Sequence, residues 1–142
     1  MVLRAVDRFA KVLDIHSDAR TDKVVALLTD SRAGLLFWDA ARQLQLRIEG
    51  VARVIDAASA EGDAVFSELS DRARSAYRHG PDPKTPISAA DGYDDREDAR
   101  VRFRLIRIEA RRMEALSLAD GTQARAEWIG ARSWSEASWL VP

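Results

Sequence analysis

Residues 16–23 read His-Ser-Asp-Ala-Arg-Thr-Asp-Lys, and the rest of the chain is best interpreted around this stretch. It follows a strand-like segment, residues 11–16, and precedes a short apolar helix predicted for residues 24–29. Two cations, two hydroxyls and the first turn of a helix meet here. The amide groups and the dipole at the start of a helix attract phosphate. The turn therefore predicts an anion cradle.

The segments on either side of the turn predict β-strands. Residues 2–7 and 11–16 are short and alternating, which is typical of an antiparallel hairpin. Residues 34–39 include the apolar run Leu35–Trp38, so we expect both faces of that strand to be covered, one of them for example by a second subunit. The longest strand, residues 42–55, places Gln43, Gln45, Arg47 and Glu49 on one face, which is either solvated or lines a site. We expect Gly50 to mark a bulge or a bend.

The second half of the chain predicts one longer helix and then more strands. The helix spans residues 59–77, and a loop at 80–99 carries an acidic run, residues 91–98, that we expect to be mobile. Strands are predicted at 101–108, 113–118, 123–129 and 138–141, the last anchored by Trp139 and Leu140. About seven strands, one short helix and one longer helix predict a mainly β (α+β) fold, an antiparallel barrel with helical additions.

Composition narrows the range of functions. The 142 residues suit one domain, and a net charge of −1 gives no basic field for nucleic acid. The chain has no cysteine, and its two histidines form no ligand pattern, so no metal site is predicted. No apolar run approaches the roughly 20 residues that span a membrane, and the start does not resemble a signal peptide. We therefore expect a cytoplasmic protein with neither a membrane nor a nucleic acid as its partner.

Three stretches together resemble the pyridoxamine 5′-phosphate oxidase-like family of FMN-binding split β-barrels. They are residues 17–23, Leu-Leu-Phe-Trp at 35–38 and Gln-Leu-Arg-Ile-Glu-Gly at 45–50. Residues 114–118 and the ending, 139–142, are similar to the family's C-terminal strands. The resemblance implies a split barrel, FMN as the cofactor and a homodimer with FMN at the subunit interface. It also implies a single domain over 1–142 that lacks the family's usual N-terminal strand and helix.

The resemblance also implies which side chains hold the cofactor. Lys23 and Arg20 would bind the FMN phosphate, with a hydroxyl from Ser17, while Gln45 would reach the flavin from the long strand. Arg4 would lie along the flavin from the first strand. The full set implied in this way is Arg4, His16, Ser17, Arg20, Thr21, Lys23, Gln45 and Arg125.

Several departures from the family pattern concern the cofactor phosphate and the substrate. Asp22 stands where the family often has a second cation, and a carboxylate there would repel phosphate. The family's Tyr, Arg and Ser clamp for a substrate phosphate has no convincing match in residues 59–77. Its late Arg-Leu-His-Asp-Arg run is replaced by residues 121–125, Gly-Thr-Gln-Ala-Arg. These differences speak against pyridoxamine phosphate as the substrate.

Two readings of these residues remain open. Arg20 and Lys23 are either a phosphate site or surface charges, although cations at a helix start are unfavourable without an anion. Gln45 and Arg47 are either ligands or solvated strand residues, with Glu49 as an alternative partner for Arg47.

Two functions are accordingly expected. The first is an FMN-dependent oxidoreductase acting on an unknown small molecule, with no side chain required as acid or base. The second is a catalytically inactive split-barrel dimer that serves as a ligand-binding or structural and regulatory module. The substrate and the electron acceptor are not determined by the sequence.

Overall fold

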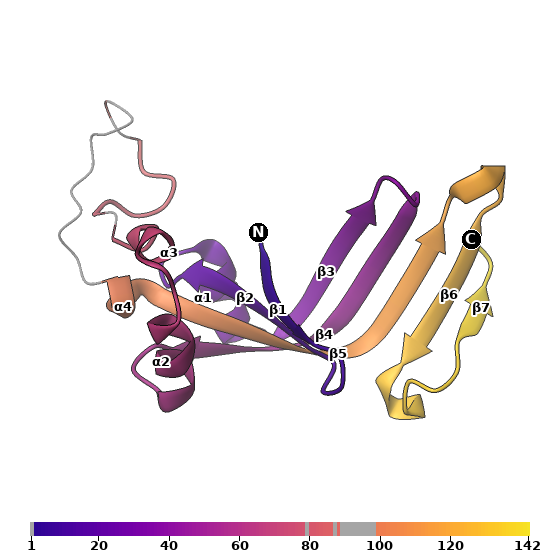
Figure 1. Cartoon of the computed structure of the whole chain (residues 1–142), viewed down its shortest axis with the longest axis horizontal. Helices are drawn as coiled ribbons and strands as arrows, with labels where there is room; N and C mark the ends of the chain where they lie inside the picture. Colours follow the sequence, from indigo (N-terminus) through magenta and orange to yellow (C-terminus); the bar gives the residue numbers. More distant parts are fainter. Residues whose placement is uncertain (1, 79, 87, 89–98) are drawn as a thin grey trace. The chain divides into compact units, whose positions relative to one another are not determined.

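The computed structural model describes residues 2–78, 80–86, 88 and 99–142 (Figure 1). The acidic run at 91–98, predicted to be a mobile loop, lies outside the described residues. Within them, seven strands form one sheet in the order β1-β2-β5-β4-β3, with β6 paired to β5 and β7 to β6. The strands are β1 Leu3–Asp7, β2 Val12–Asp18, β3 Arg32–Asp39, β4 Leu44–Asp56, β5 Phe103–Ser117, β6 Ala124–Ile129 and β7 Ser138–Leu140.

The helices are short and fall mainly between strands. They are α1 Asp22–Thr29, α2 Ala60–Ser67, α3 Asp71–Ser75 and α4 Ala99–Arg102, with two single 3₁₀ turns at Ala119–Gly121 and Gly130–Arg132. The predicted fold class, a mainly antiparallel β-structure with few helices, is confirmed.

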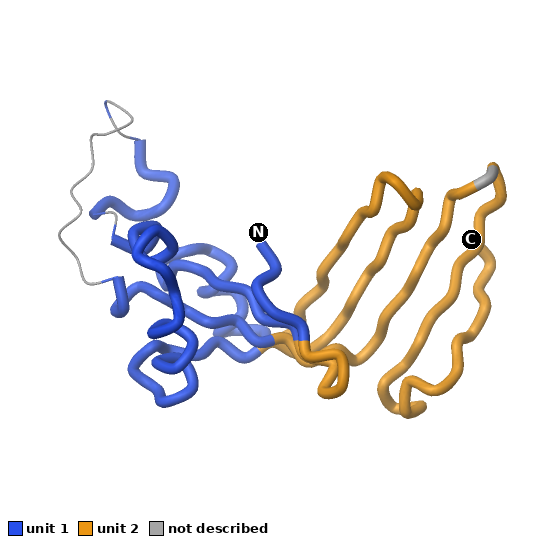
Figure 2. The backbone as a smooth tube through the Cα atoms, viewed as in Figure 1, with its two compact units in different colours: residues 1–6, 13–31, 53–107 blue, residues 7–12, 32–52, 108–142 orange. Residues whose placement is uncertain are grey.

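The chain divides into two compact units, each built from three segments (Figure 2). Unit 1 comprises residues 1–6, 13–31 and 53–107, and unit 2 comprises 7–12, 32–52 and 108–142. The long strands β4 and β5 contribute residues to both units. The single domain predicted over 1–142 stays a prediction.

Unit 1 has an aromatic core centred on the first residue of β5. Phe103 is fully buried, and the rings of His16, Phe66 and Tyr77 meet it edge-on at centroid distances of 5.0, 5.4 and 5.3 Å. Edge-to-face pairs of this kind add to the energy of apolar burial. The core therefore fixes β2, which carries His16 into the turn, against β5 and the helices after β4.

Unit 2 is built from antiparallel pairs. In β3 and β4, Trp38 lies opposite Gln45 and Leu36 opposite Arg47. In β5 and β6, Glu114 lies opposite Glu127 and Leu116 opposite Arg125. Residues directly opposite in a pair share one face of the sheet, so the polar residues of these strands line up with Leu36 and Trp38.

Two predicted elements are wrong. The helix expected at 59–77 is two helices, because Ser70 starts α3 by accepting a hydrogen bond from the amide of Ala73 at 3.3 Å. The strands expected at 101–108 and 113–118 are one strand, β5, preceded by α4. Between the two predicted strands, Glu109 and Arg111 are exposed, whereas Ala110 is buried and its amide donates a hydrogen bond to the carbonyl of Lys11. The alternation therefore continues through the charges.

Two further expectations need correction, and a third is met within this chain on one face only. Gly50 does not mark a bulge, because the pairing of β4 with β3 continues through it without a break in register. It lies where β4 and β5 approach closely, and a Cβ there would lie 2.2 Å from the carbonyl oxygen of Glu109. Trp139 does not anchor the last strand within this chain, because 77% of it is exposed. The apolar strand β3 is covered on one face only: Leu35 is buried, whereas Leu36 and Trp38 are 65% and 54% exposed. A second subunit as the cover stays a prediction.

Candidate functional site: the turn before helix α1

A chain of hydroxyl and ammonium groups runs through the turn between β2 and α1. Lys23 Nζ donates to Ser17 Oγ at 3.2 Å, and Ser17 Oγ lies 3.0 Å from Thr21 Oγ1. Thr21 Oγ1 donates to the carbonyl oxygen of Asp18 at 2.9 Å. Ser17 is buried, whereas Lys23 is exposed. The ammonium group therefore contacts a neutral hydroxyl and remains accessible to an anion.

The backbone at this point starts a helix without using a side-chain cap. Thr21 occupies the N-cap position in an extended conformation, and its hydroxyl makes no capping hydrogen bond. Burial of Val24, which is 1% exposed, fixes the first turn of α1 on unit 1. The helix start thus presents its amide end beside Lys23, where an anion is stabilised by the helix dipole.

Arg20 is committed to partners within the protein. Its Nε and Nη2 atoms donate to the two carboxylate oxygens of Asp18 at 3.0 and 2.8 Å. Its Nη1 atom donates to the carbonyl oxygens of Gly80 and Pro81 at 3.1 and 2.8 Å and to Asp82 Oδ1 at 3.2 Å. Hydrogen bonds from Arg20 lower the pKa of Asp18 against the effect of burial, and the bond to Asp18 raises the pKa of Arg20. The carboxylate of Asp18 and the guanidinium of Arg20 are therefore both ionised.

Asp22 also has a partner. Lys84 Nζ forms an ion pair with Asp22 Oδ2, and this bond lowers the pKa of the exposed carboxyl. The carboxylate that the sequence places beside the expected phosphate site is therefore partly neutralised by a lysine far along the chain.

Arg4 and His16 belong to the same unit as the turn. Burial lowers the pKa of His16, the nearby positive charge of Arg4 lowers it further, and Asp14 opposes both effects. The imidazole is therefore held neutral near pH 7. Six of the predicted cofactor residues thus lie in unit 1: Arg4, His16, Ser17, Arg20, Thr21 and Lys23.

Gln45 lies in unit 2 and lines a shallow pocket of about 320 Å³. Gly34, Leu35, Leu36 and Arg47 form the rest of the lining. Arg47 pairs with Glu49 at 3.1 Å, so the alternative partner proposed for it from the sequence is the observed one. Gln45 therefore lines this pocket with an amide group that can both donate and accept hydrogen bonds.

Arg125, also in unit 2, is part of an ion-pair network. Arg125 and Arg112 both donate to Glu114 Oε2 at 2.8 Å, and Arg112 further contacts Glu49 and Glu127 at 3.4 and 2.8 Å. The hydrogen bond from Arg125, together with the positive charges of Arg125 and Arg112, lowers the pKa of Glu114, which is only 6% exposed. The buried Nε of Arg125 has no hydrogen-bond partner. The network holds Arg125 in place and leaves one of its donors unsatisfied.

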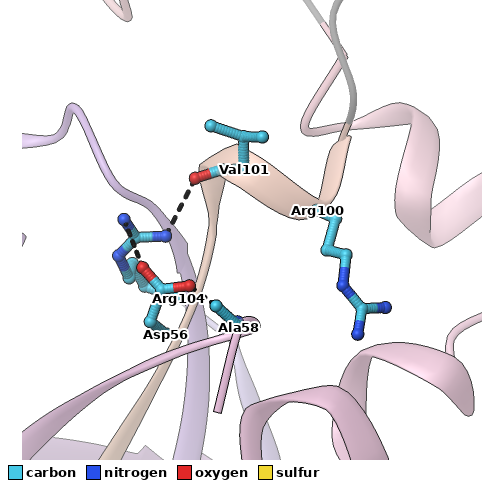
Figure 3. Close-up of a pocket in the computed structure, with 5 residues that line it drawn as sticks. All are labelled: Asp56, Ala58, Arg100, Val101 and Arg104. Atoms are coloured by element: carbon cyan, nitrogen blue, oxygen red, sulfur yellow. Dashed lines mark hydrogen bonds and ion pairs between the residues drawn. The ribbon is translucent and has the colours of Figure 1, made fainter.

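A second pocket, of about 270 Å³, lies in unit 1 at the start of β5 (Figure 3). Arg104 pairs with Asp56 at 2.8 Å and donates to the carbonyl of Val101 at 2.9 Å. Arg100 points away from that pair and forms an ion pair with Asp63. Both arginines thus have carboxylate partners, and the pocket is not assigned to the cofactor.

Two further kinds of feature are absent from the described residues. Among the described residues, no group of His, Asp and Glu side chains could hold a metal ion. In the same part of the chain, no helix has both the length and the apolar character needed to cross a membrane.

Sequence reasoning missed two contributors to the turn. Arg102 is 5% exposed, its carbonyl accepts a hydrogen bond from the amide of Ala19 at 2.7 Å, and its Nη2 donates to Gly80 O at 3.3 Å. The Gly80–Pro81 carbonyls bind Arg20. In the sequence, Arg102 belongs to an alternating strand pattern, and nothing there distinguishes it from a solvated residue.

Comparison with known proteins agrees with this architecture. Residues 2–56, which include the turn and Gln45, match the family model of the pyridoxamine 5′-phosphate oxidase FMN-binding domain. A pyridoxamine 5′-phosphate oxidase-related, FMN-binding protein from Nostoc punctiforme has the same fold, with a TM-score of 0.81 and 20% identity over 99% of this chain and 78% of that chain. No curated protein matches the chain.

PhzG from Burkholderia lata, solved with tetrahydrophenazine-1-carboxylic acid, is also similar. Its TM-score is 0.70 at 19% identity, over 99% of this chain and 72% of that chain. At such identities the structural likeness shows the fold alone. The resemblance predicted from the sequence is confirmed, and the predicted cofactor, FMN, is that of the matched domain.

Proposed function

We propose that this chain binds FMN through the turn before α1 and acts, as a homodimer, as a flavin-dependent oxidoreductase on a small molecule. The observation that carries the proposal is the Lys23–Ser17–Thr21 chain at the start of α1, inside the segment that matches an FMN-binding domain. An ammonium group, two hydroxyls and a helix start form a donor set that fits a phosphate monoester.

The other predicted residues are proposed to contact the rest of the cofactor. Arg4 and the neutral His16 lie in unit 1, as the turn does. Gln45 and Arg125, which lie in unit 2, stay predicted flavin contacts on the strength of the resemblance. Bound FMN would supply the redox chemistry. The side chains of this protein would hold the phosphate and shape the substrate pocket, so we name no catalytic residue.

The homodimer is supported by the open face of β3. Leu36 and Trp38 are exposed on that face, and β3 ends the main order of strands in the sheet. Exposed apolar surface rimmed by polar residues is typical of protein–protein interaction sites when it forms a large enough patch. A second copy is proposed to cover them, with FMN at the subunit interface. The cytoplasmic location expected from the sequence stays a prediction.

The test is a flavin titration combined with a mass measurement. Purified protein is titrated with FMN and with riboflavin while flavin fluorescence is followed, and its mass is measured by light scattering. The proposal expects a dimer that quenches FMN fluorescence and prefers FMN over riboflavin, which lacks the phosphate. A protein that binds neither flavin contradicts it. A Leu36→Glu variant should be monomeric if β3 lies in the interface.

A second candidate is a split-barrel dimer without catalytic activity, acting as a ligand-binding or structural module. It is favoured by the commitment of Arg20, Arg112 and Arg125 to carboxylates, which leaves fewer donors for a substrate. Flavin binding without steady oxidation of reduced nicotinamide, tested with oxygen and quinone acceptors, would favour this candidate.

A further inference from the structure

The strongest contacts of the candidate site join the turn to a distant segment of unit 1. Arg20 reaches about 60 residues along the chain, and its side chain is only 20% exposed. All three of its guanidinium nitrogens donate hydrogen bonds, to Asp18 and to the carbonyls of residues 80 and 81. Because an arginine presents its donors in a rigid planar fork, this arrangement fixes two chain segments in one geometry.

Other contacts join the same two segments. Gly80 O accepts from Arg102 as well as from Arg20. Lys84 pairs with Asp22, the first residue of α1, and the backbone of Lys84 has φ of 73°. A residue with a Cβ disfavours that left-handed conformation, so the backbone at Lys84 is strained while its side chain pairs with Asp22. Residues 80–84 thus meet the turn at Arg20 and at Asp22, on either side of Thr21.

We propose that Arg20 is a positioning residue and not a phosphate ligand: it fastens residues 80–84 to the turn, so that this segment forms a wall of the FMN-phosphate site. Only the identity of the ligand, FMN, rests on the proposed function. The attachment of residues 80–84 to the turn is a property of the free protein. We refer to residues 80–84 as the wall segment.

The distinction follows from where each cation's donors point. Lys23 has a neutral hydroxyl as its partner and is exposed, whereas the charge of Arg20 is already balanced by Asp18, whose side chain is 11% exposed. A phosphate would have to displace a bidentate carboxylate to reach Arg20. Loss of Lys23 therefore removes attraction for the phosphate, while loss of Arg20 loosens the wall segment and weakens binding of any flavin that touches it.

The first experiment uses the free protein, which has no cysteine of its own. A nitroxide label on Thr85→Cys, next to the wall segment, reports its mobility by electron paramagnetic resonance. Adding Arg20→Ala should raise the mobility of the label, and Arg20→Lys should do so too, because lysine keeps the charge but not the fork. Lys23→Ala should leave it unchanged. A label at Glu136→Cys, which lies in unit 2, controls for general loosening.

An unchanged spectrum in both Arg20 variants overturns the proposal, whether or not FMN binds. If Arg20→Ala fails to fold, Asp18→Asn provides the second route, because it removes half of the ion pair while leaving Arg20 in place. The label at Thr85→Cys should also become more mobile in the Asp18→Asn variant. Mobility equal to that in the protein with Asp18 overturns the proposal equally.

The second experiment compares two flavins. Arg20→Ala should weaken FMN and riboflavin by the same factor, so that the ratio of their affinities equals that of the wild type. Lys23→Ala should lower that ratio about tenfold, as expected for one lost charge-assisted hydrogen bond. A fall of the ratio in Arg20→Ala makes Arg20 a phosphate ligand and overturns the proposal. Unchanged affinity of Arg20→Ala for both flavins would mean that the wall segment does not contact the bound flavin, which also overturns the proposal. If the wild-type protein binds neither flavin, the proposed function is wrong. The label experiment still tests whether Arg20 holds the wall segment against the turn.

Discussion

The turn before α1 and the charged face of the unit 2 sheet contain the same residue types but use them differently. On the sheet, Arg112 and Arg125 share Glu114, and each positive charge meets a carboxylate. In the turn, Arg20 is paired in the same way, whereas Lys23 donates its hydrogen bond to the hydroxyl of Ser17 and interacts with the charge of Asp22 without a salt bridge between these two described residues. Cations already saturated by carboxylates stabilise structure, and a cation with a neutral partner is the one available to a ligand. The predictions below test that difference.

Substitution of Glu114 should have the largest effect on stability. Glu114→Gln leaves two partly buried arginines short of a carboxylate. Breaking a buried pair costs about 3–5 kcal/mol, and since both arginines are about one-third exposed we expect about 2–3 kcal/mol. Urea unfolding followed by circular dichroism measures it. Glu109→Gln, which removes an exposed partner of Arg111, is the matched control and should change stability by less than about 0.5 kcal/mol. Equal effects in the two variants would remove the distinction.

Lys23→Ala should show the opposite behaviour. The side chain is exposed, so stability should change by less than about 0.5 kcal/mol. Affinity for FMN should fall about tenfold or more, because a hydrogen bond from a charged group to phosphate contributes about 1.5–3 kcal/mol. Riboflavin affinity should stay constant, and Arg42→Ala, an exposed cation of unit 2, should change neither. A Lys23 variant that keeps full FMN affinity places the phosphate elsewhere.

The local part of this site could be predicted from the sequence. The strand, the hydroxyl-rich turn and the helix start are neighbours in the chain, so the contacts among Ser17, Thr21 and Lys23 follow from spacing alone. The hairpin before the turn and the long strand with Gln45 were likewise readable from alternation. These elements depend on short-range rules, in which side-chain period and turn residues decide the structure.

The partners of the arginines could not be predicted in this way. The sequence places Arg20 and Lys23 side by side and predicts one role for both. Only the fold brings Gly80 and Pro81 to Arg20, and only the β5–β6 register brings Arg125 to Glu114. A strand pattern tells which face a residue occupies but not which residue lies opposite, because register depends on the whole sheet. The same limit explains Gly50, whose role is set by the backbone of Glu109 on another strand.

Acid should affect the two regions in different pH windows. Burial lowers the pKa of His16, so the unfolded state binds a proton first as the pH falls through the ordinary value near 6.5. Stability therefore starts to fall at that pH and stops falling below the lowered pKa of the folded state. The pKa of Glu114 is lowered from its ordinary value near 4.5, so its contribution is present above that value and is lost as the pH falls through its folded pKa. Urea unfolding against pH should lose the first window in His16→Asn. The second window should shrink in Glu114→Gln without vanishing, because the pKa values of Asp18 and Asp63 are lowered as well. A single window unaffected by either variant contradicts this assignment.

Asp22→Asn should have the smallest effect and the most informative sign. Asp22 is exposed, and its carboxylate is paired with Lys84, so the amide variant should fold as the wild type does. Removing the negative charge next to Lys23 should strengthen binding of FMN by about two- to threefold, as expected for one exposed charge screened by water. The gain should disappear for riboflavin and shrink in high salt. Weaker FMN binding would instead mean that the Asp22–Lys84 pair matters more for holding the wall segment than it costs in repulsion. In that case the turn would resemble the sheet face, with paired charges setting its shape and Lys23 supplying the attraction for phosphate.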